Sequence, residues 1–124
     1  VVQRENVNLL SVTLRHVSAN DDAVLSYAPQ DSIAVVLYIN QELSANGTEQ
    51  ASRWTQHLVD AAHQCDGTYY LVYQRYPKLG QLRSVYRRFD EFVERKREHD
   101  RDELFMNRFY DHYAAGISRG SDEE

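Results

Sequence analysis

The chain has 124 residues, of which 42% are hydrophobic and 27% charged. This length and composition predict one globular domain with a single modest core. Lysine and arginine total 14 against 19 aspartate and glutamate residues, which gives a formal net charge of -5 at pH 7. Such an acidic balance has no general attraction for phosphate backbones, so no nucleic acid partner is expected.

The single cysteine, Cys65, excludes an internal disulfide and a cysteine metal cluster. A lone thiol is compatible with a reducing compartment, and we expect a cytoplasmic protein, with peripheral membrane association also compatible. No apolar run approaches the ~20 residues of a transmembrane helix, so no transmembrane segment is predicted. The first residues contain neither an initiator methionine nor a signal peptide, which we interpret as a cut end of a longer protein.

Three stretches have the pattern of β-strands. Residues 8–17 alternate between apolar and polar side chains, which predicts a strand with one polar face. Residues 32–41 form a nearly continuous apolar run, which predicts a central strand buried on both faces. A third strand is expected at residues 68–76, where aromatic and β-branched side chains are concentrated.

Two amphipathic helices are predicted from apolar residues that recur in steps of three and four. The first covers residues 48–64, with Asn46 or Thr48 as its N-cap. The second carries Leu82 to Arg97, with charged side chains on the opposite face. Residues 103–114 are expected to form a separate short helix or turn.

This order of elements predicts an α+β fold, a small antiparallel sheet with its helices packed on one face. Residues 1–115 form the domain, and residues 116–124 form a flexible acidic tail. The core is expected to consist of the in-phase apolar residues of these elements: Leu10, Val12, Leu14, Ile33, Val35, Val36, Leu37, Trp54, Leu58, Leu71, Phe89 and Phe92.

Motifs for catalysis are scarce. The five histidines show no HExxH spacing, and no GxGxxG, Walker or GxSxG motif is present, so no metal site is predicted. On the polar strand face, Arg15 is either an anchor for an oxygen-rich ligand or a solvated strand residue. The tyrosines of residues 69–76 either line a pocket for a sugar or ring, or pack against the sheet.

Residues 67–110 read GTYYLVYQRYPKLGQLRSVYRRFDEFVERKREHDRDELFMNRFY. This segment resembles the C-terminal part of FAD-linked oxidases of the vanillyl-alcohol-oxidase superfamily, in particular the aldonolactone and alditol oxidases. Arg87 and Arg101 stand where the family has proline. The upstream SVTLRHVSANDD resembles a strand of the same branch, so the resemblance spans Val12 to Tyr113. The residues in register with the family motif are Tyr86, Phe89, Asp90, Glu91, Phe92, Arg97, Asp100, Phe105 and Asn107.

The resemblance implies that this chain is the last part of a cap domain, the substrate-binding portion of an oxidoreductase acting on CH–OH donors. Its partner would be the missing N-terminal FAD-binding domain, which holds FAD in the full-length protein. A small hydroxylated substrate, such as a sugar lactone or an alditol, would give a hydride to the flavin. No cofactor is expected in this chain alone, which should be colourless and inactive.

The resemblance also implies positions for the site, without assigning a catalytic residue. Relatives often have an acid at the position of Thr13 and a lysine at that of Tyr73, so the substrate or the handling of protons is expected to differ. The substrate-facing positions are Thr13, Arg15, Asn40, Glu42 and Tyr73. The positions on the flavin side are Phe105 and Asn107, and both should be under-packed in this chain.

The alternative function is a free-standing α+β protein-interaction module without catalysis, which pairs with another chain through its aromatic strand. In either case, apolar surface that lacks its partner is expected to favour self-association.

Overall fold

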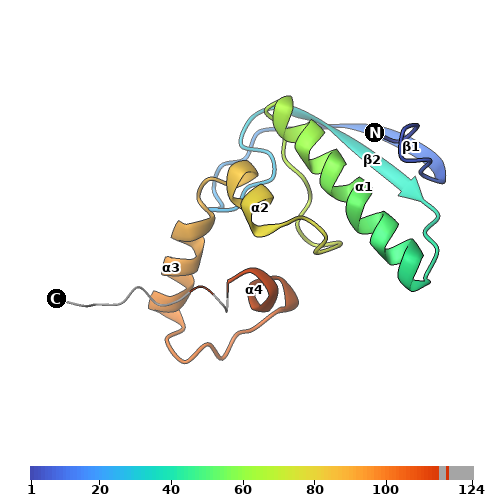
Figure 1. The fold of residues 1–124 in the computed structure, drawn as a ribbon. Coiled ribbons are helices and arrows are strands. Elements are labelled where there is room, and N and C mark those ends of the chain that lie inside the picture. Colours follow the sequence, from blue (N-terminus) through green and yellow to red (C-terminus); the bar gives the residue numbers. More distant parts are fainter. Residues whose placement is uncertain (115–116, 118–124) are drawn as a thin grey trace.

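The computed structural model describes residues 1–114 and residue 117, and its fold is α+β, as predicted. The described part contains one two-stranded antiparallel sheet and four helices. Figure 1 shows α1 alongside the sheet; α2 packs against α1, where Gln81 Nε2 donates to the Gln56 carbonyl, and α3 and α4 follow beyond α2. The predicted tail at residues 116–124 lies, apart from Ile117, outside the described residues. The elements are β1 (Leu9–Val17), β2 (Ser32–Ile39), α1 (Ala45–Gln64), α2 (Leu79–Val85), α3 (Phe89–His99) and α4 (Arg108–Tyr113).

The two strands pair with Val12 opposite Leu37 and Leu14 opposite Val35. Residues that stand opposite one another share a face of a sheet, and neighbours along a strand point to opposite faces. Thr13 therefore lies on the face away from Val12 and Leu14, as the alternation predicts. We call the face that carries Val12, Leu14, Ile33 and Val35 the apolar sheet face.

Helix α1 begins three residues earlier than predicted. Its N-cap is Ser44, whose Oγ accepts a hydrogen bond of 3.0 Å from the Gly47 N–H. The expected caps, Asn46 and Thr48, lie inside the first turn instead. A serine hydroxyl at this position satisfies one of the N–H groups that a helix start leaves unpaired, so the helix gains a turn.

Residues 68–76 do not form the predicted third strand. Side chains from α1 and from the residue that follows α2 bond to carbonyl groups that a neighbouring strand would otherwise bond. The Tyr86 hydroxyl donates to the Tyr69 carbonyl, and Gln56 Nε2 donates to the Tyr76 carbonyl over 2.8 Å. Because buried backbone groups need a partner but not a strand as partner, this segment is held as an ordered loop.

The second long helix of the prediction is divided into α2 and α3 by a turn at residues 86–88. Tyr86 leaves the helical region with φ -107° and ψ 79°, and the Phe89 N–H donates to its carbonyl over 2.9 Å. An ion pair of 2.8 Å between Arg83 and Asp90 spans the turn. The apolar residues continue in steps of three and four across this turn, so their spacing did not predict a break in the helix.

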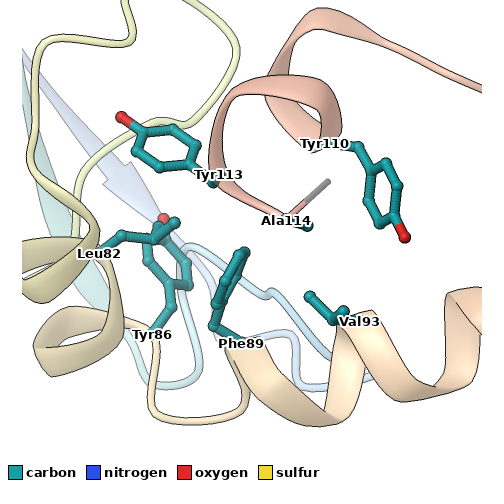
Figure 2. Close-up of a cluster of buried hydrophobic side chains, with 7 residues drawn as sticks. All are labelled: Leu82, Tyr86, Phe89, Val93, Tyr110, Tyr113 and Ala114. Atoms are coloured by element: carbon teal, nitrogen blue, oxygen red, sulfur yellow. The ribbon is translucent and has the colours of Figure 1, made fainter. Parts of the chain in front are cut away.

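The buried core lies between α2, α3 and α4, as Figure 2 shows. Partly buried rings pack against it, some of them edge to face; the Phe89 and Phe109 centroids, for example, are 6.1 Å apart at 84°. This arrangement is the one that aromatic quadrupoles favour. The cluster consists of Leu82, Tyr86, Phe89, Val93, Tyr110, Tyr113 and Ala114.

The predicted core is therefore wrong for most of the strand residues. Leu10, Val12, Leu14, Ile33, Val35 and Val36 are exposed, with exposed fractions between 41% and 66%. Leu37, Trp54, Leu58, Leu71 and Phe92 are partly buried, and Phe89 is completely buried. The physical reason is that the aromatic residues of the helices bury one another and not the sheet.

Candidate functional site

An open hollow of about 570 Å³ lies beside the core. Four segments that are distant in the sequence meet there: the loop before β2, the irregular segment after α1, helix α3 and the start of α4. Its size falls in the range of small-molecule sites. The lining residues are Leu25, Leu71, Val72, Tyr73, Gln74, Arg75, Phe92, Asn107, Arg108 and Phe109.

The floor of the hollow is apolar and rests on the core. Leu25, Leu71, Phe92 and Phe109 are all partly buried and pack against the core cluster. The rings of Phe92 and Phe109 have their centroids 6.4 Å apart. Because these side chains are held by the core beneath them, the floor is a fixed apolar surface.

The rim of the hollow is polar and rich in hydrogen-bond donors. Arg75 Nη1 donates to the Arg108 carbonyl over 3.1 Å, which ties the irregular segment to α4. Asn107 Oδ1 caps α4 by accepting from the Tyr110 N–H over 2.8 Å, so its Nδ2 group remains for another acceptor. No aspartate or glutamate is among the residues that line this hollow.

A row of exposed tyrosines adjoins the hollow. The rings of Tyr27 and Tyr70 are 5.2 Å apart, and those of Tyr70 and Tyr73 are 5.3 Å apart, both edge to face. The last ring of the row, Tyr73, is 76% exposed. Tyr70 and Tyr73 were expected either to line a pocket or to pack against the sheet. They do not pack on a sheet, and Tyr73 lines the hollow.

The predicted substrate-facing residues of the sheet are not gathered at one place. Arg15 pairs with Ala34 near one end of the sheet, whereas Asn40 and Glu42 follow the opposite end, where Leu9 pairs with Ile39. Arg15 and Leu9 are six residue steps apart, a distance of about 20 Å at ~3.3 Å per residue. Thr13 and Arg15 share one exposed face, as the alternation predicts.

Two other predicted residues do meet in the structure. Tyr73, expected on the substrate side, and Asn107, expected on the flavin side, both line the hollow. Phe105 lies outside the lining residues and is 80% exposed, so it is under-packed as expected. Asn107 is exposed too, but its side chain has a structural role as the α4 cap.

Arg75 and Arg108, which supply the positive charge of the rim, were not predicted as site residues from the sequence. The signal available in the sequence was an arginine on each side of an aromatic cluster, in a chain whose net charge is -5. This signal predicted no site, because Arg75 was expected on a strand and Arg108 in a helix or turn. Nothing in the sequence indicated that the two arginines lie close together.

Two buried tyrosines of the core and one partly buried tyrosine that packs against it have raised pKa values. Burial raises the pKa of Tyr86 and of Tyr113 to about 12, and burial also raises that of Tyr69 above its usual range. The neutral phenol is favoured because charge is costly in an apolar environment. The Tyr113 hydroxyl donates to the Pro77 carbonyl over 2.7 Å, which a phenolate is unable to do.

We expect the chain to lose stability at alkaline pH. Tyrosine in an unfolded chain ionises near pH 10. Since the folded pKa of Tyr86 and Tyr113 is raised to about 12, their stabilising effect is complete below pH 10 and is lost as pH rises through 12. Phenolate absorbance and far-ultraviolet circular dichroism should show these phenols ionising together with the loss of helix. The exposed control variant Tyr73→Phe should leave the transition in place, and ionisation of all tyrosines with the helices intact would contradict the prediction.

Neither a metal centre nor a membrane span is found in residues 1–114 and 117. Among these residues, no group of three or more histidine, cysteine, aspartate and glutamate side chains is placed to hold a metal ion. Over the same part of the chain, no helix has both the length and the hydrophobicity that crossing a membrane requires.

Comparisons of the chain with protein-family models, with curated proteins and with solved structures found no match in any of the three.

Proposed function

We propose that this chain is the substrate-cap portion of an FAD-dependent oxidoreductase, which acts on a small hydroxyl-bearing substrate together with a separate flavin-binding domain. The observation that carries the proposal is the apolar sheet face, whose four side chains have exposed fractions between 48% and 66%. A contiguous apolar surface of this kind is typical of one that another protein surface covers. A cap that closes on a flavin domain requires such a surface.

The family motif gives a second line of support, because several of its residues hold the backbone at the end of the chain. Asp100 accepts hydrogen bonds of 2.9 Å from the N–H groups of Leu104 and Phe105. Arg97 donates to the carbonyls of Ala114 and Ile117 over 3.2 and 2.9 Å. These contacts fix the connection from α3 to α4 with Phe105 projecting outward, where relatives place it toward the flavin.

The glycines of the described residues do not adopt the backbone conformation of one common FAD-binding loop. A dinucleotide pyrophosphate is commonly held by a glycine-rich loop at a helix N-terminus, and such loops use glycines in the left-handed region. No glycine among the described residues has a positive φ. The proposal therefore assigns the flavin to the partner domain, and it gives this chain the tasks of binding and orienting the substrate.

The test uses the protein as cells make it. An antibody raised against this chain should capture a protein that releases flavin fluorescence when it is denatured. In that holoprotein, Arg15→Ala should lower turnover while flavin remains bound. A captured protein that contains no flavin would overturn the proposal.

The 124-residue chain alone gives a complementary test. It should be colourless, and calorimetric titration with FAD should show no binding at micromolar concentration. A flavin absorbance band that survives dialysis would show that the chain holds its own cofactor, contrary to the proposed division of the enzyme.

A second candidate function is a free-standing interaction module, which the same exposed sheet face also favours. Under this alternative, light scattering should show self-association that Leu14→Lys abolishes. The matched control is Thr13→Lys, which puts the same charge on the opposite face of the same strand. A flavin-free native protein that associates through the apolar sheet face would favour the module over the cap.

A further inference from the structure

The hollow differs from the rest of the molecule in charge. The chain carries a net charge of -5, yet the residues lining the hollow include two arginines and no carboxylate. Within the described part of the chain, neither Arg75 nor Arg108 takes part in an ion pair, whereas most of the other arginines with a fixed partner face a glutamate or an aspartate. Within residues 1–114 and 117, these two arginines therefore lack the carboxylate partner that most of the others have.

The donors of the hollow are placed above an apolar floor. Arg75 is held at the rim by its bond to the Arg108 carbonyl, and its remaining N–H groups have no acceptor in the described residues. The amide of Gln74 and the Nδ2 group of Asn107 add further donors beside it. Guanidinium groups match carboxylates in geometry and form the stronger, charge-assisted hydrogen bonds.

The apolar floor of the hollow favours a ligand that carries a flat ring. Phe92 and Phe109 present aromatic surface, with Leu25 and Leu71 beside them. A flat ring gains by covering such a surface, because apolar area leaves water and rings stack or meet edge to face. The volume of about 570 Å³ is sufficient for one or two fused rings with a short substituent.

From the charge and the floor together, we infer that this hollow binds a small aromatic carboxylate, with the ring on Phe92 and Phe109 and the carboxylate at Arg75 and Arg108. The inference does not rest on the proposed oxidoreductase function, since it concerns binding by this chain alone. A neutral ligand of the same shape would leave the two guanidinium groups without an acceptor and should bind more weakly.

The experiment is a calorimetric titration of the 124-residue chain with 2-naphthoate at low ionic strength, compared with 2-naphthalenemethanol, its neutral analogue. We expect saturable binding of one naphthoate per chain, at least tenfold tighter than that of the alcohol. Arg75→Gln and Arg108→Gln should each weaken naphthoate binding about tenfold, which corresponds to about 1.4 kcal/mol. Circular dichroism should confirm that each variant keeps its helices.

The matched control is Arg87→Gln, which removes an exposed arginine that lies in the turn between α2 and α3 and outside the hollow. This variant should bind naphthoate like the unchanged chain. Three results would overturn the inference: equal affinity for naphthoate and the alcohol, an equal loss in Arg87→Gln, or displacement of naphthoate by inorganic phosphate at equal concentration. The last result would indicate a site for any anion, without selection for the ring.

Discussion

Replacing Phe89 with alanine is expected to lower the free energy of unfolding by about 3–5 kcal/mol, the usual cost of removing a buried phenylalanine. Phe89 has no exposed surface and lies at the centre of the core cluster, with Phe92 and Phe109 as ring neighbours at 6.3 and 6.1 Å. The cavity would open between α3 and α4, which are held together there. Urea denaturation followed by circular dichroism measures the change.

Phe105→Ala is the matched control, since it removes the same side chain from a position that is 80% exposed. Its effect should stay within about 0.5 kcal/mol, as is usual for surface substitutions. Similar losses for the two variants would mean that the core of the protein lies elsewhere, for example between the sheet and α1.

The sequence predicted where the regular elements lie better than it predicted what covers them. Residues 8–17 contain β1, with the expected alternation of faces, and residues 32–41 contain β2. The expected burial of β2 on both faces is wrong, because the described sheet has two strands and Ile33, Val35 and Val36 are exposed. Period-2 alternation states which side chains share a face, because that follows from strand geometry. It does not state whether another layer lies on that face. The strand residues were assigned to the core on that assumption, and Leu14 is 66% exposed.

The failure at residues 68–76 has a related cause. Aromatic and β-branched residues favour strands chiefly because they suit a partly buried, pleated surface, and this preference depends on context. A strand also needs a neighbour with a free edge. Here Tyr86 and Gln56 bond to the carbonyls first, and they come from the turn after α2 and from α1, which no local pattern places near this segment.

The candidate site shows the same limit. Tyr73 and Asn107 were selected through family resemblance and meet in one hollow, but Arg75 and Arg108 were not selected by any pattern. A charged residue in a sequence is ordinarily predicted to lie on the solvated surface. Two arginines indicate a site when the fold brings them together without a counterion. That juxtaposition depends on how the loop after α1 crosses the start of α4, which is a property of the tertiary structure.

Gly47→Ala is expected to destabilise the chain by about 1–3 kcal/mol, the usual cost of inserting a group into a filled space. An added Cβ would lie 2.3 Å from the Glu42 carbonyl oxygen and 2.7 Å from the Glu42 Cβ, so the backbone that leads into α1 would have to move. At most helix positions the same replacement stabilises the protein, because alanine inside a helix is more favourable than glycine by roughly 0.5–1 kcal/mol.

Gly80, in α2, is the matched control, since nothing lies within 4 Å of its added Cβ. Gly80→Ala should therefore raise the free energy of unfolding by up to about 1 kcal/mol, measured by the same denaturation. A gain in both variants would show that residues 41–43 do not cross α1 as closely as the structure has them, and that the helix start at Ser44 is free to shift.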